Sequence, residues 1–301
     1  MKAQAPKHRL PGTSYALVLA GGGARGMAHA GVLRALQAYG CPPSALVGVS
    51  MGAIVAAAYA LNPDWYRALL KVEPPRLPQI LTASERGLFE RLRGSLAREM
   101  TLHQLVHGWG LRAGTVRRIR AQLHDLVCGR SLEESRPPLF VIATDLRSGS
   151  SVVLDHGDAS EAIYASSALA GLLPPLPRDD GLLADGGYAD QAPIQVARQT
   201  GARAVVVVDP DYELEGWAPG NGLEAMARAL EISMQEHARL LLGEADLILR
   251  PRFSLPIRAL DFEHKRLAVA AGIRAVRESL PHLRALLKER GMVGDKLVRV
   301  L

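Results

Sequence analysis

The pentapeptide Gly-Val-Ser-Met-Gly at residues 48–52 constrains the fold more than any other segment of the chain. It follows a short apolar strand pattern and precedes a run of small residues that predicts a helix over residues 51–61. Gly48 and Gly52 permit a sharp strand-to-helix turn, because a side chain at either position would clash with the neighbouring strand and helix. Such a turn holds a serine hydroxyl exposed above the sheet edge, so Ser50 is the candidate nucleophile.

The Gly-Xaa-Ser-Xaa-Gly pattern also occurs by chance in glycine-rich proteins, where its serine is an ordinary turn or cap residue. A second glycine-rich turn favours the functional interpretation. It follows the apolar run at residues 15–20 and opens a helix predicted to reach residue 39. Consecutive glycines leave backbone N–H groups bare at the positive end of a helix dipole, which predicts an anion site. The turn consists of Gly21, Gly22, Gly23, Ala24, Arg25 and Gly26.

Three glycines of this turn also match the Gly-Xaa-Gly-Xaa-Xaa-Gly fingerprint of dinucleotide-binding folds. That function needs an acidic residue roughly 20 positions further on to hold the ribose. No Asp or Glu stands between Ala28 and Asn62. An oxyanion hole beside Ser50 is therefore the better interpretation, and we expect neither an organic cofactor nor a metal.

A third segment, at residues 182–188, predicts an apolar strand that ends in Asp185, Gly186 and Gly187. Active sites of α/β proteins assemble at the carboxyl edge of a parallel sheet, which predicts that Asp185 lies on the same edge as Ser50. The alternative is an aspartate that only stabilises an Asx-turn.

Together these segments resemble the patatin-like phospholipase family, the serine lipid acyl hydrolases that use a Ser-Asp dyad. Residues 21–26 match its oxyanion motif, residues 48–52 its nucleophile motif and residues 185–187 its Asp-Gly-Gly motif. A fourth family block, Ala-Ser-Xaa-Ala-Xaa-Pro followed by Phe-Pro-Pro, is similar to residues 165–175. There Ala170 replaces the usual proline and Leu173 the usual phenylalanine, and we expect these departures to affect substrate fit.

The resemblance implies that Ser50 attacks a lipid ester while Asp185 acts as general base and then as general acid. A carboxylate near its usual pKa is a weak base toward a hydroxyl, so burial should raise the pKa of Asp185. The implied oxyanion hole consists of backbone N–H groups of Gly21, Gly22, Gly23 and Ala24, joined by Met51. The implied supporting residues are Arg25, Gly26, Gly48, Gly52, Gly186 and Gly187.

Two details of this site have alternatives. Arg25 either ties down its own loop or faces a lipid phosphate. A histidine-containing triad would need a histidine after the acid, and His237, His264 and His282 all stand in charged, helix-like surroundings rather than in a glycine-rich loop.

Length and composition fit one enzyme domain, because 301 residues with 48% hydrophobic content can form a large core. Alternating strand and helix patterns predict an α/β fold, and the resemblance specifies a three-layer α/β/α patatin-like fold with a mostly parallel central sheet. We expect a loose tail over residues 1–14, a catalytic domain over 15–210 with a helical cap insertion at 64–130, and a C-terminal helical extension over 211–301 packed on the same domain. Later strands are predicted near Leu139, Val152, Leu182, Val205 and Leu247.

Amphipathic segments offer surfaces for lipid. In the insertion, aromatic and basic residues, including Arg86, Arg91, Arg93 and Arg98, would form a membrane-facing lip. Alternatively, the apolar residues pack inward and the arginines mark a solvated face. Residues 263–287 predict a helix interrupted at Pro281, which docks on the sheet or, alternatively, binds a partner or membrane. Its expected apolar face consists of Leu267, Ile273, Val276 and Leu280.

Charge and cysteine content suggest the surroundings of the protein. The 36 Lys and Arg exceed the 30 Asp and Glu, and the net charge of +6 favours peripheral contact with an anionic membrane surface. No basic run suggests nucleic acid. Cys41 and Cys128 suggest neither a disulfide framework nor a metal site, and no apolar segment is long enough for a membrane span or signal sequence. We expect a cytoplasmic protein, at most peripheral at the inner membrane face, and assign no oligomeric state.

A function from another class is also compatible with these motifs. An acyl-lipid or anionic-ligand binding module of the same fold would keep the pocket without turnover. The presence of both Ser50 and Asp185 argues against a binding module. The changes at Ala170 and Leu173 are compatible with one.

Overall fold

The computed structural model describes residues 15–72, 110–179, 181–210, 218–220 and 222–292. The expected tail at residues 1–14 lies outside the described residues, as do the four arginines of the expected lip, Arg86, Arg91, Arg93 and Arg98.

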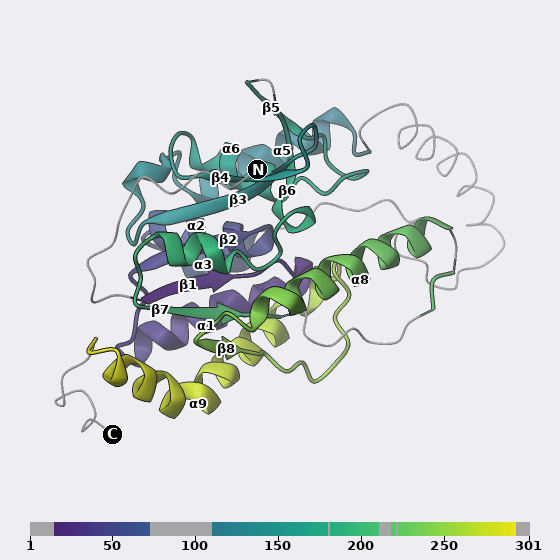
Figure 1. The fold of residues 1–301 in the computed structure, drawn as a ribbon. Coiled ribbons are helices and arrows are strands. Elements are labelled where there is room, and N and C mark those ends of the chain that lie inside the picture. The colour runs from purple at the N-terminus through teal and green to yellow at the C-terminus, as the bar shows by residue number, and fades with distance from the viewer. Residues whose placement is uncertain (1–14, 73–109, 180, 211–217, 221, 293–301) are drawn as a thin grey trace.

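An eight-stranded sheet forms the centre of the fold (Figure 1). Hydrogen-bonded neighbours follow the order β5-β6-β3-β2-β1-β7-β8, and β4 pairs with β3. The parallel strands are β1 (Tyr15–Leu19), β2 (Ala45–Val49), β3 (Leu139–Asp145), β7 (Ala204–Val208) and β8 (Leu247–Leu249). Antiparallel pairing joins β4 (Ser150–Leu154), β5 (Leu176–Arg178) and β6 (Gly181–Asp185) to the sheet. The predicted mostly parallel sheet is confirmed, and the short strand β5 is an addition to the prediction.

Helices cover both faces of the sheet, which gives the predicted three layers. One hydrophobic cluster joins the sheet to α1 (Ala28–Ala38), α2 (Met51–Leu61), α6 (Ala159–Ser166) and α9 (Lys265–Glu289). The other joins it to α7 (Ile194–Gln199) and α8 (Gly222–Leu242). Short 3-10 turns are η1 (Gly23–Met27), η3 (Leu132–Glu134), η4 (Gly186–Tyr188) and η5 (Phe262–His264).

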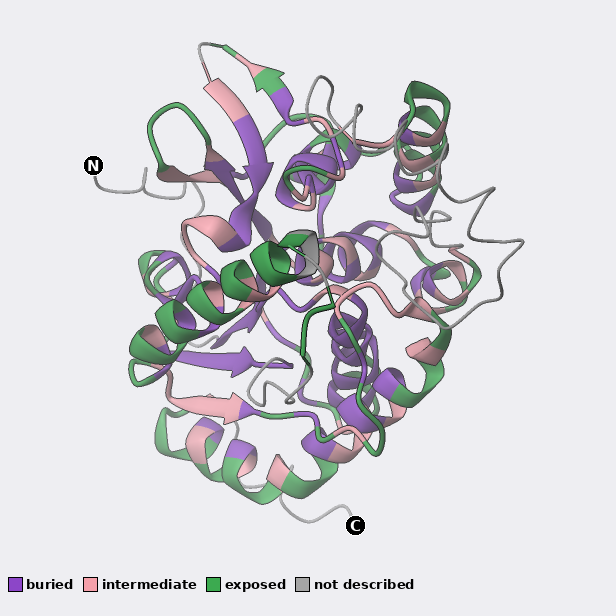
Figure 2. Cartoon of the chain, turned by 90° about the vertical axis from the view of Figure 1, so that its right-hand side faces the viewer, coloured by how far each residue is buried: buried purple, intermediate pink, exposed green. Residues whose placement is uncertain are grey.

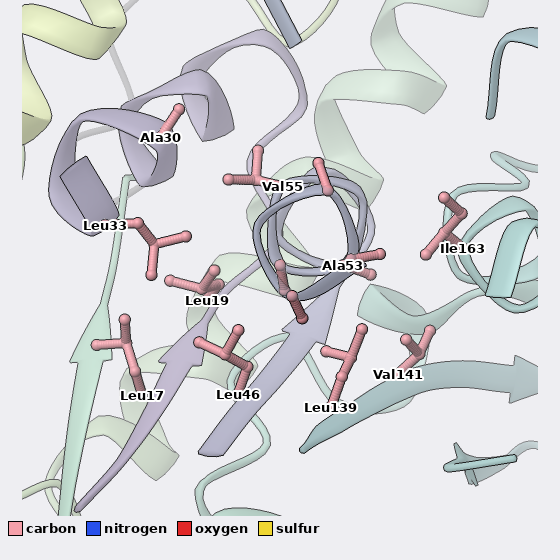
Figure 3. Close-up of a cluster of buried hydrophobic side chains, with 14 of the residues drawn as sticks. Leu17, Leu19, Ala30, Leu33, Leu46, Ala53, Val55, Leu139, Val141 and Ile163 are labelled. Atoms are coloured by element: carbon pink, nitrogen blue, oxygen red, sulfur yellow. The ribbon is translucent and has the colours of Figure 1, made fainter. Parts of the chain in front are cut away.

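Strand side chains alternate between these two faces, as the pleat requires. Leu17 and Leu19 of β1 point toward the face covered by α1 and α2, where Leu33 of α1 lies next to them (Figure 3). Ala16 and Val18 face the opposite cluster. A strand covered on both sides needs a continuous apolar sequence, and β7, Ala-Val-Val-Val-Val, is buried throughout. Figure 2 shows the same burial across the central strands.

The predicted insertion contributes two described helices, α3 (Trp65–Lys71) and α5 (Ala113–Leu126). Trp65 packs inward, with its ring 5.1 Å from that of Tyr59 in an edge-to-face arrangement. Tyr66 lies under the guanidinium of Arg34 at 4.1 Å. These two aromatics therefore stabilise packing rather than face a lipid. Across the described parts of the chain, no helix has the length and apolarity needed to cross a bilayer.

The C-terminal helix α9 docks on the fold, but it differs from the prediction in two ways. It runs through Pro281 to Glu289, because Leu283 and Leu287 beyond the proline are buried and hold the last turns. Leu267, expected on the packed face, is 39% exposed. Val276 is buried as expected, and the packed face also carries the small residues Ala268, Gly272 and Ala275.

A close crossing of α1 and α9 explains this preference for small residues (Figure 1). A Cβ atom on Gly31 of α1 would lie 1.9 Å from the carbonyl oxygen of Val269. A Cβ atom on Gly272 of α9 would lie 2.0 Å from the carbonyl oxygen of Ala28. The two backbones are in contact at Gly31 and Gly272, so only small side chains fit at the crossing itself.

We expect Gly31→Ala and Gly272→Ala each to lower the free energy of unfolding by about 1–3 kcal/mol or more, because the methyl group forces the helices apart. Gly114→Ala on α5 is the matched control: no atom lies within 4 Å of the added methyl group, and the change should raise helix stability by up to about 1 kcal/mol. Urea unfolding measures all three. A Gly272→Ala midpoint equal to that of the wild type would show that the crossing is not tight.

Candidate active site

Strand β3 brings Ser50 and Asp185 together, because two strands share one of its sides. Ile142 of β3 pairs with Val49 at the end of β2 and also with β4, so β2 and β4 lie on opposite sides of β3. Ala143 pairs with β4 and also with Asp185 at the end of β6, which places β6 on the β2 side. The two strands therefore run toward each other and end beside consecutive residues of β3.

The reason for the placement of Asp185 differs from the prediction. We expected its strand to end at the carboxyl edge of a parallel sheet, whereas β6 runs antiparallel to β3. It enters beyond the carboxyl end of β3, where Leu183 pairs with Asp145, and stops opposite Ala143. Asp185 reaches the edge where Ser50 lies because β6 is short and approaches from outside.

Ser50 occupies the strained turn between β2 and α2, with φ 53° and ψ −121°. A Cβ atom on Gly52 would lie 2.1 Å from the carbonyl oxygen of Leu19. A Cβ atom on Gly48 would lie 2.6 Å from the Cα atom of Ala53. These contacts confirm that the flanking glycines are required by close approach to the neighbouring strand and helix.

A direct hydrogen bond joins the two candidate catalytic residues. Ser50 Oγ donates to Oδ2 of Asp185 at 2.7 Å, and Asp185 Oδ1 accepts from the N–H of Gly187 at 2.9 Å. The second bond caps the turn η4, so Asp185 also has the structural role that the sequence left as an alternative. Both roles operate at once, one through each carboxylate oxygen.

Burial changes the acidity of this carboxyl group. Asp185 is only 3% exposed. Burial raises the pKa of Asp185 to about 6, against the lowering influence of its hydrogen bonds from Ser50 and Gly187. The direction agrees with the sequence prediction. At neutral pH the carboxyl group is largely ionised, yet it is a stronger base than an exposed aspartate.

The glycine turn lies at the end of β1, on the other side of β2 from β3. Two of its N–H groups already have acceptors: that of Gly21 donates to the Gln191 carbonyl at 3.4 Å, and that of Ala24 to the Ala259 carbonyl at 2.7 Å. Gly22 and Gly23 precede and begin η1, so their N–H groups have no acceptor in that helix. No other described residue accepts from them.

Arg25 and Gly26 support the turn in different ways. The Arg25 side chain is buried, and it donates to Glu231 of α8 at 2.6 Å and to the carbonyl of Ile257 at 3.4 Å. Its role is structural, but it joins the turn to these distant segments rather than tying down its own loop. A Cβ atom on Gly26 would lie 2.7 Å from that of Met51, so the glycine lets the turn approach the start of α2.

Ser166, at the end of α6, is a site residue that the sequence did not single out. Its Oγ accepts from the N–H of Ser50 at 2.9 Å and donates to the carbonyl of Ile142 at 2.5 Å. Ser166 therefore fixes the nucleophile turn to β3. The adjacent Ser167 only bonds back to Ile163 and Tyr164 within its own helix. The family block separates the two serines, because it has a serine at position 166 and any residue at position 167.

His29 holds the end of β1 in place just before the glycine turn. Its Nε2 lies 2.8 Å from the carbonyl oxygen of Ala20, and a carbonyl only accepts, so Nε2 carries the proton. Burial lowers the pKa of His29 to about 4, and the ring is neutral at physiological pH. No pattern in the sequence predicts this role.

The three histidines considered for a triad are elsewhere. His237 lies on α8 and His282 on α9, both exposed, and Nδ1 of His264 pairs with Asp261 at 2.8 Å. None of the described histidines is hydrogen-bonded to Ser50 or Asp185. Within the described residues, no cluster of His, Cys, Asp and Glu is suited to hold a metal ion.

The two departures from the family block have different environments. Leu173 is buried in the hydrophobic core, where it packs with the cluster of α2 and α6. Ala170 is exposed in the loop that follows α6. Leucine, which is smaller than the usual phenylalanine, is therefore packed within the hydrophobic core at position 173.

This fold and geometry define a class: α/β proteins in which a serine at a nucleophile elbow bonds directly to a buried aspartate. Comparison with known sequences is more specific. Residues 17–198 match the family described as patatin-like phospholipase, and the chain belongs to that family.

Similar curated proteins include lysophospholipase NTE1 of Cryptococcus neoformans, 35% identical over 201 residues, a match covering 67% of this chain and 11% of that protein. Patatin-like phospholipase domain-containing protein 7 of Mus musculus is 31% identical, with 66% of this chain and 14% of that protein covered. The chain thus spans a small part of these relatives' length. Among solved structures, VipD from Legionella pneumophila matches with TM-score 0.44 and 15% identity, covering 91% of this chain and 68% of VipD.

We expect Asp185→Asn to become more stable relative to the wild type as the pH rises. The folded pKa of about 6 lies above the unfolded value of about 4, so the folded wild type binds more protons between these values and loses stability as pH rises through them. The amide does not titrate and avoids this loss. Thermal unfolding from about pH 4 to pH 8 measures the difference in Tm.

Asp145→Asn is the control for this titration. Hydrogen bonds from Leu182 and Ser148 hold the pKa of Asp145 at about 2, below the unfolded value. The difference in stability between Asp145→Asn and the wild type should therefore change with pH only below about pH 4 and be constant above it. A Tm difference for Asp185→Asn that is equally flat would contradict the raised pKa.

Proposed function

We propose that this protein is a serine acyl hydrolase that cleaves carboxylic ester bonds of lipids through an acyl-Ser50 intermediate. The observation that carries the proposal is the 2.7 Å hydrogen bond from Ser50 Oγ to Asp185 Oδ2 at the nucleophile elbow. Membership of the patatin-like phospholipase family and the lysophospholipase among its relatives support a lipid ester as the substrate.

The reaction proceeds in two halves. In the first, Asp185 Oδ2 accepts the hydroxyl proton while Ser50 Oγ bonds to the ester carbonyl carbon, and the carbonyl oxygen becomes an oxyanion. The C–O bond of the ester then breaks, and the proton passes from Asp185 to the departing alkoxide. In the second half, Asp185 takes a proton from water and the hydroxide adds to the carbonyl carbon of the acyl-serine. The bond between this carbon and Ser50 Oγ then breaks, Oγ takes the proton from Asp185, and the carboxylic acid leaves.

Asp185 fits both roles because its two oxygens are divided between them. Oδ1 stays bonded to the N–H of Gly187, which fixes the carboxyl plane, while Oδ2 faces Ser50 and exchanges the proton. Its raised pKa, about 6, makes it more basic than an exposed carboxylate and still ionised at neutral pH. No histidine is needed between the two residues.

The oxyanion hole of this proposal uses fewer backbone N–H donors than the one implied by the sequence. The N–H groups of Gly21 and Ala24 already donate to carbonyl oxygens, which makes them poor candidates. The N–H groups of Gly22 and Gly23 have no acceptor among the described residues, and Met51 begins α2, where an N–H has no partner within the helix. We assign the oxyanion to these three donors.

Lipid substrates bring the protein to a surface. We infer peripheral contact with an anionic membrane, reached from the cytoplasmic side, which the net charge of +6 supports. Liposome flotation at low and high salt tests this contact, because electrostatic attraction weakens as salt rises.

A fluorophosphonate should label the purified protein once, on Ser50, as read by intact mass and peptide mapping. Ser50→Ala should abolish the adduct, and Asp185→Asn should slow labelling and ester turnover by about 100-fold or more, since an amide cannot accept the proton. Tyr164→Phe, which removes a hydroxyl that donates to the carbonyl of Pro174 and not to Ser50 or Asp185, serves as a control for folding and handling.

Failure of the folded wild type to label or to hydrolyse any small ester would sink the enzyme proposal. Binding of acyl lipid by such a protein would then identify the binding module of the same fold as its function. An adduct on a different serine would reject the assignment of Ser50.

The pH dependence of kcat/KM should report the titration of Asp185. The base must be ionised to accept the Ser50 proton, so kcat/KM should rise with pH, with an apparent pKa near the 6 of the folded enzyme. Initial rates on a short-chain ester over about pH 4 to pH 9 measure this profile. A rate that is independent of pH through this range would mean that Asp185 is not the base.

A further inference from the structure

The hydroxyl group of Tyr188 lies beside the dyad and has no part in the mechanism above. Tyr188 closes the turn η4 that Asp185 begins, and its side chain is half-buried. Burial raises the pKa of Tyr188, and the Asp185 charge adds to this effect. The phenol therefore stays protonated, and it remains a hydrogen-bond donor across the working pH range.

Ala170 orients this hydroxyl. The backbone N–H of Ala170 donates to Tyr188 Oη at 2.7 Å. A tyrosine hydroxyl has one proton to donate in addition to its acceptor lone pairs. Among the residues that the structure describes, none accepts that proton, and both oxygens of Asp185 are already bonded to Ser50 and Gly187.

A second bond fastens the same two segments. The N–H of Asp185 donates to the carbonyl of Ala168 at 3.1 Å, so the loop after α6 and the turn after β6 are joined at two points. The bond to Tyr188 exists only because residue 170 has a backbone N–H. Proline, the residue that the family block usually has here, would lack this donor.

The position of Tyr188 decides which part of a substrate it can reach. Asp185 is the N-cap of η4, and Tyr188 is the last residue of that turn. In the proposed reaction the leaving oxygen takes its proton from Asp185 Oδ2, so it lies beside the start of η4. Tyr188 is therefore on the side of the leaving alcohol.

We propose that Tyr188, oriented by the N–H of Ala170, is a specificity-determining residue that donates a hydrogen bond to an acceptor oxygen on the leaving alcohol of the ester. This inference rests on the proposed function and deepens it. The favoured substrates are esters whose alcohol carries a hydroxyl or phosphodiester oxygen near the scissile bond. Plain alkyl esters of the same acid lack this acceptor.

Three esters with the same acyl chain test the assignment: 1-octanoylglycerol, 1-octanoyl-lysophosphatidylglycerol and hexyl octanoate. For Tyr188→Phe, the ratio of kcat/KM for a polar ester to that for the hexyl ester should fall by about 5–10-fold, the usual effect of one lost hydrogen bond. The first two substrates distinguish a hydroxyl acceptor from a phosphodiester acceptor. Ala170→Pro, which removes the orienting N–H, should lower the same ratio.

Two controls separate this role from a structural one. Ala170→Gly keeps the N–H and should keep the ratio. Tyr164→Phe removes a different tyrosine hydroxyl, which donates to the carbonyl of Pro174 in the same loop at 2.8 Å, and should lower Tm without changing the ratio. The double variant Ala170→Pro/Tyr188→Phe should show no larger ratio change than Tyr188→Phe, because both act through one hydroxyl.

The outcomes divide clearly. A selective loss in Tyr188→Phe and Ala170→Pro supports the assignment. Equal losses on all three esters, or none, would overturn it while fluorophosphonate labelling of Ser50 leaves the proposed function standing. Absence of labelling and turnover in the wild type would overturn both.

Discussion

The candidate site depends on two strands that end against each other along β3. β2 stops beside Ile142 and β6 stops beside Ala143 from the opposite direction, so the turn after β2 faces the last residue of β6. This arrangement brings Ser50 Oγ within 2.7 Å of the Asp185 carboxylate. No space remains for an imidazole between them, which is the physical basis for a site of two residues rather than three.

The same arrangement encloses the carboxylate. Asp185 is covered by its own turn and by the loop whose Ala168 carbonyl accepts from the Asp185 N–H, and little water reaches it. An ionised carboxylate in such surroundings is destabilising unless hydrogen bonds offset the lost hydration. Ser50 and Gly187 supply two such bonds, and the raised pKa shows that they offset the loss only in part. The basicity that the proposed reaction needs is therefore achieved at the expense of fold stability, which the surrounding core must provide.

Local patterns predicted most of the fold and the main site residues. The elbow at Ser50, the glycine turn and the strand before Asp185 each depend on a few adjacent residues, and sequence shows such features directly. The direction of β6 depends on pairing with β3, some 40 positions away along the chain, and on the space that β2 leaves by ending early. Ser166 was missed for a related reason, because its partners come from β2 and β3 and not from its own helix.

Packing distance explains the errors in the C-terminal helix. The sequence favoured the face with large apolar residues, whereas the contact with α1 is made where Gly31 and Gly272 let the backbones touch. At such a distance the smallest side chains are the buried ones, and a large residue such as Leu267 turns outward. Hydrophobicity identifies the packed face of a helix only when the helices are far enough apart to hold large side chains.

The chemistry and the choice of substrate are assigned to different parts of this molecule. The proposed nucleophile and base are fixed by strand ends in the sheet, which leave little freedom for change. The loop after α6 contributes only backbone groups to the site, through Ala168 and Ala170. A substitution there leaves the reacting atoms in place, but one that exchanges proline for another residue adds an N–H donor. The departure at Ala170 therefore alters which groups face the leaving alcohol, although the motifs that identify the family are unchanged.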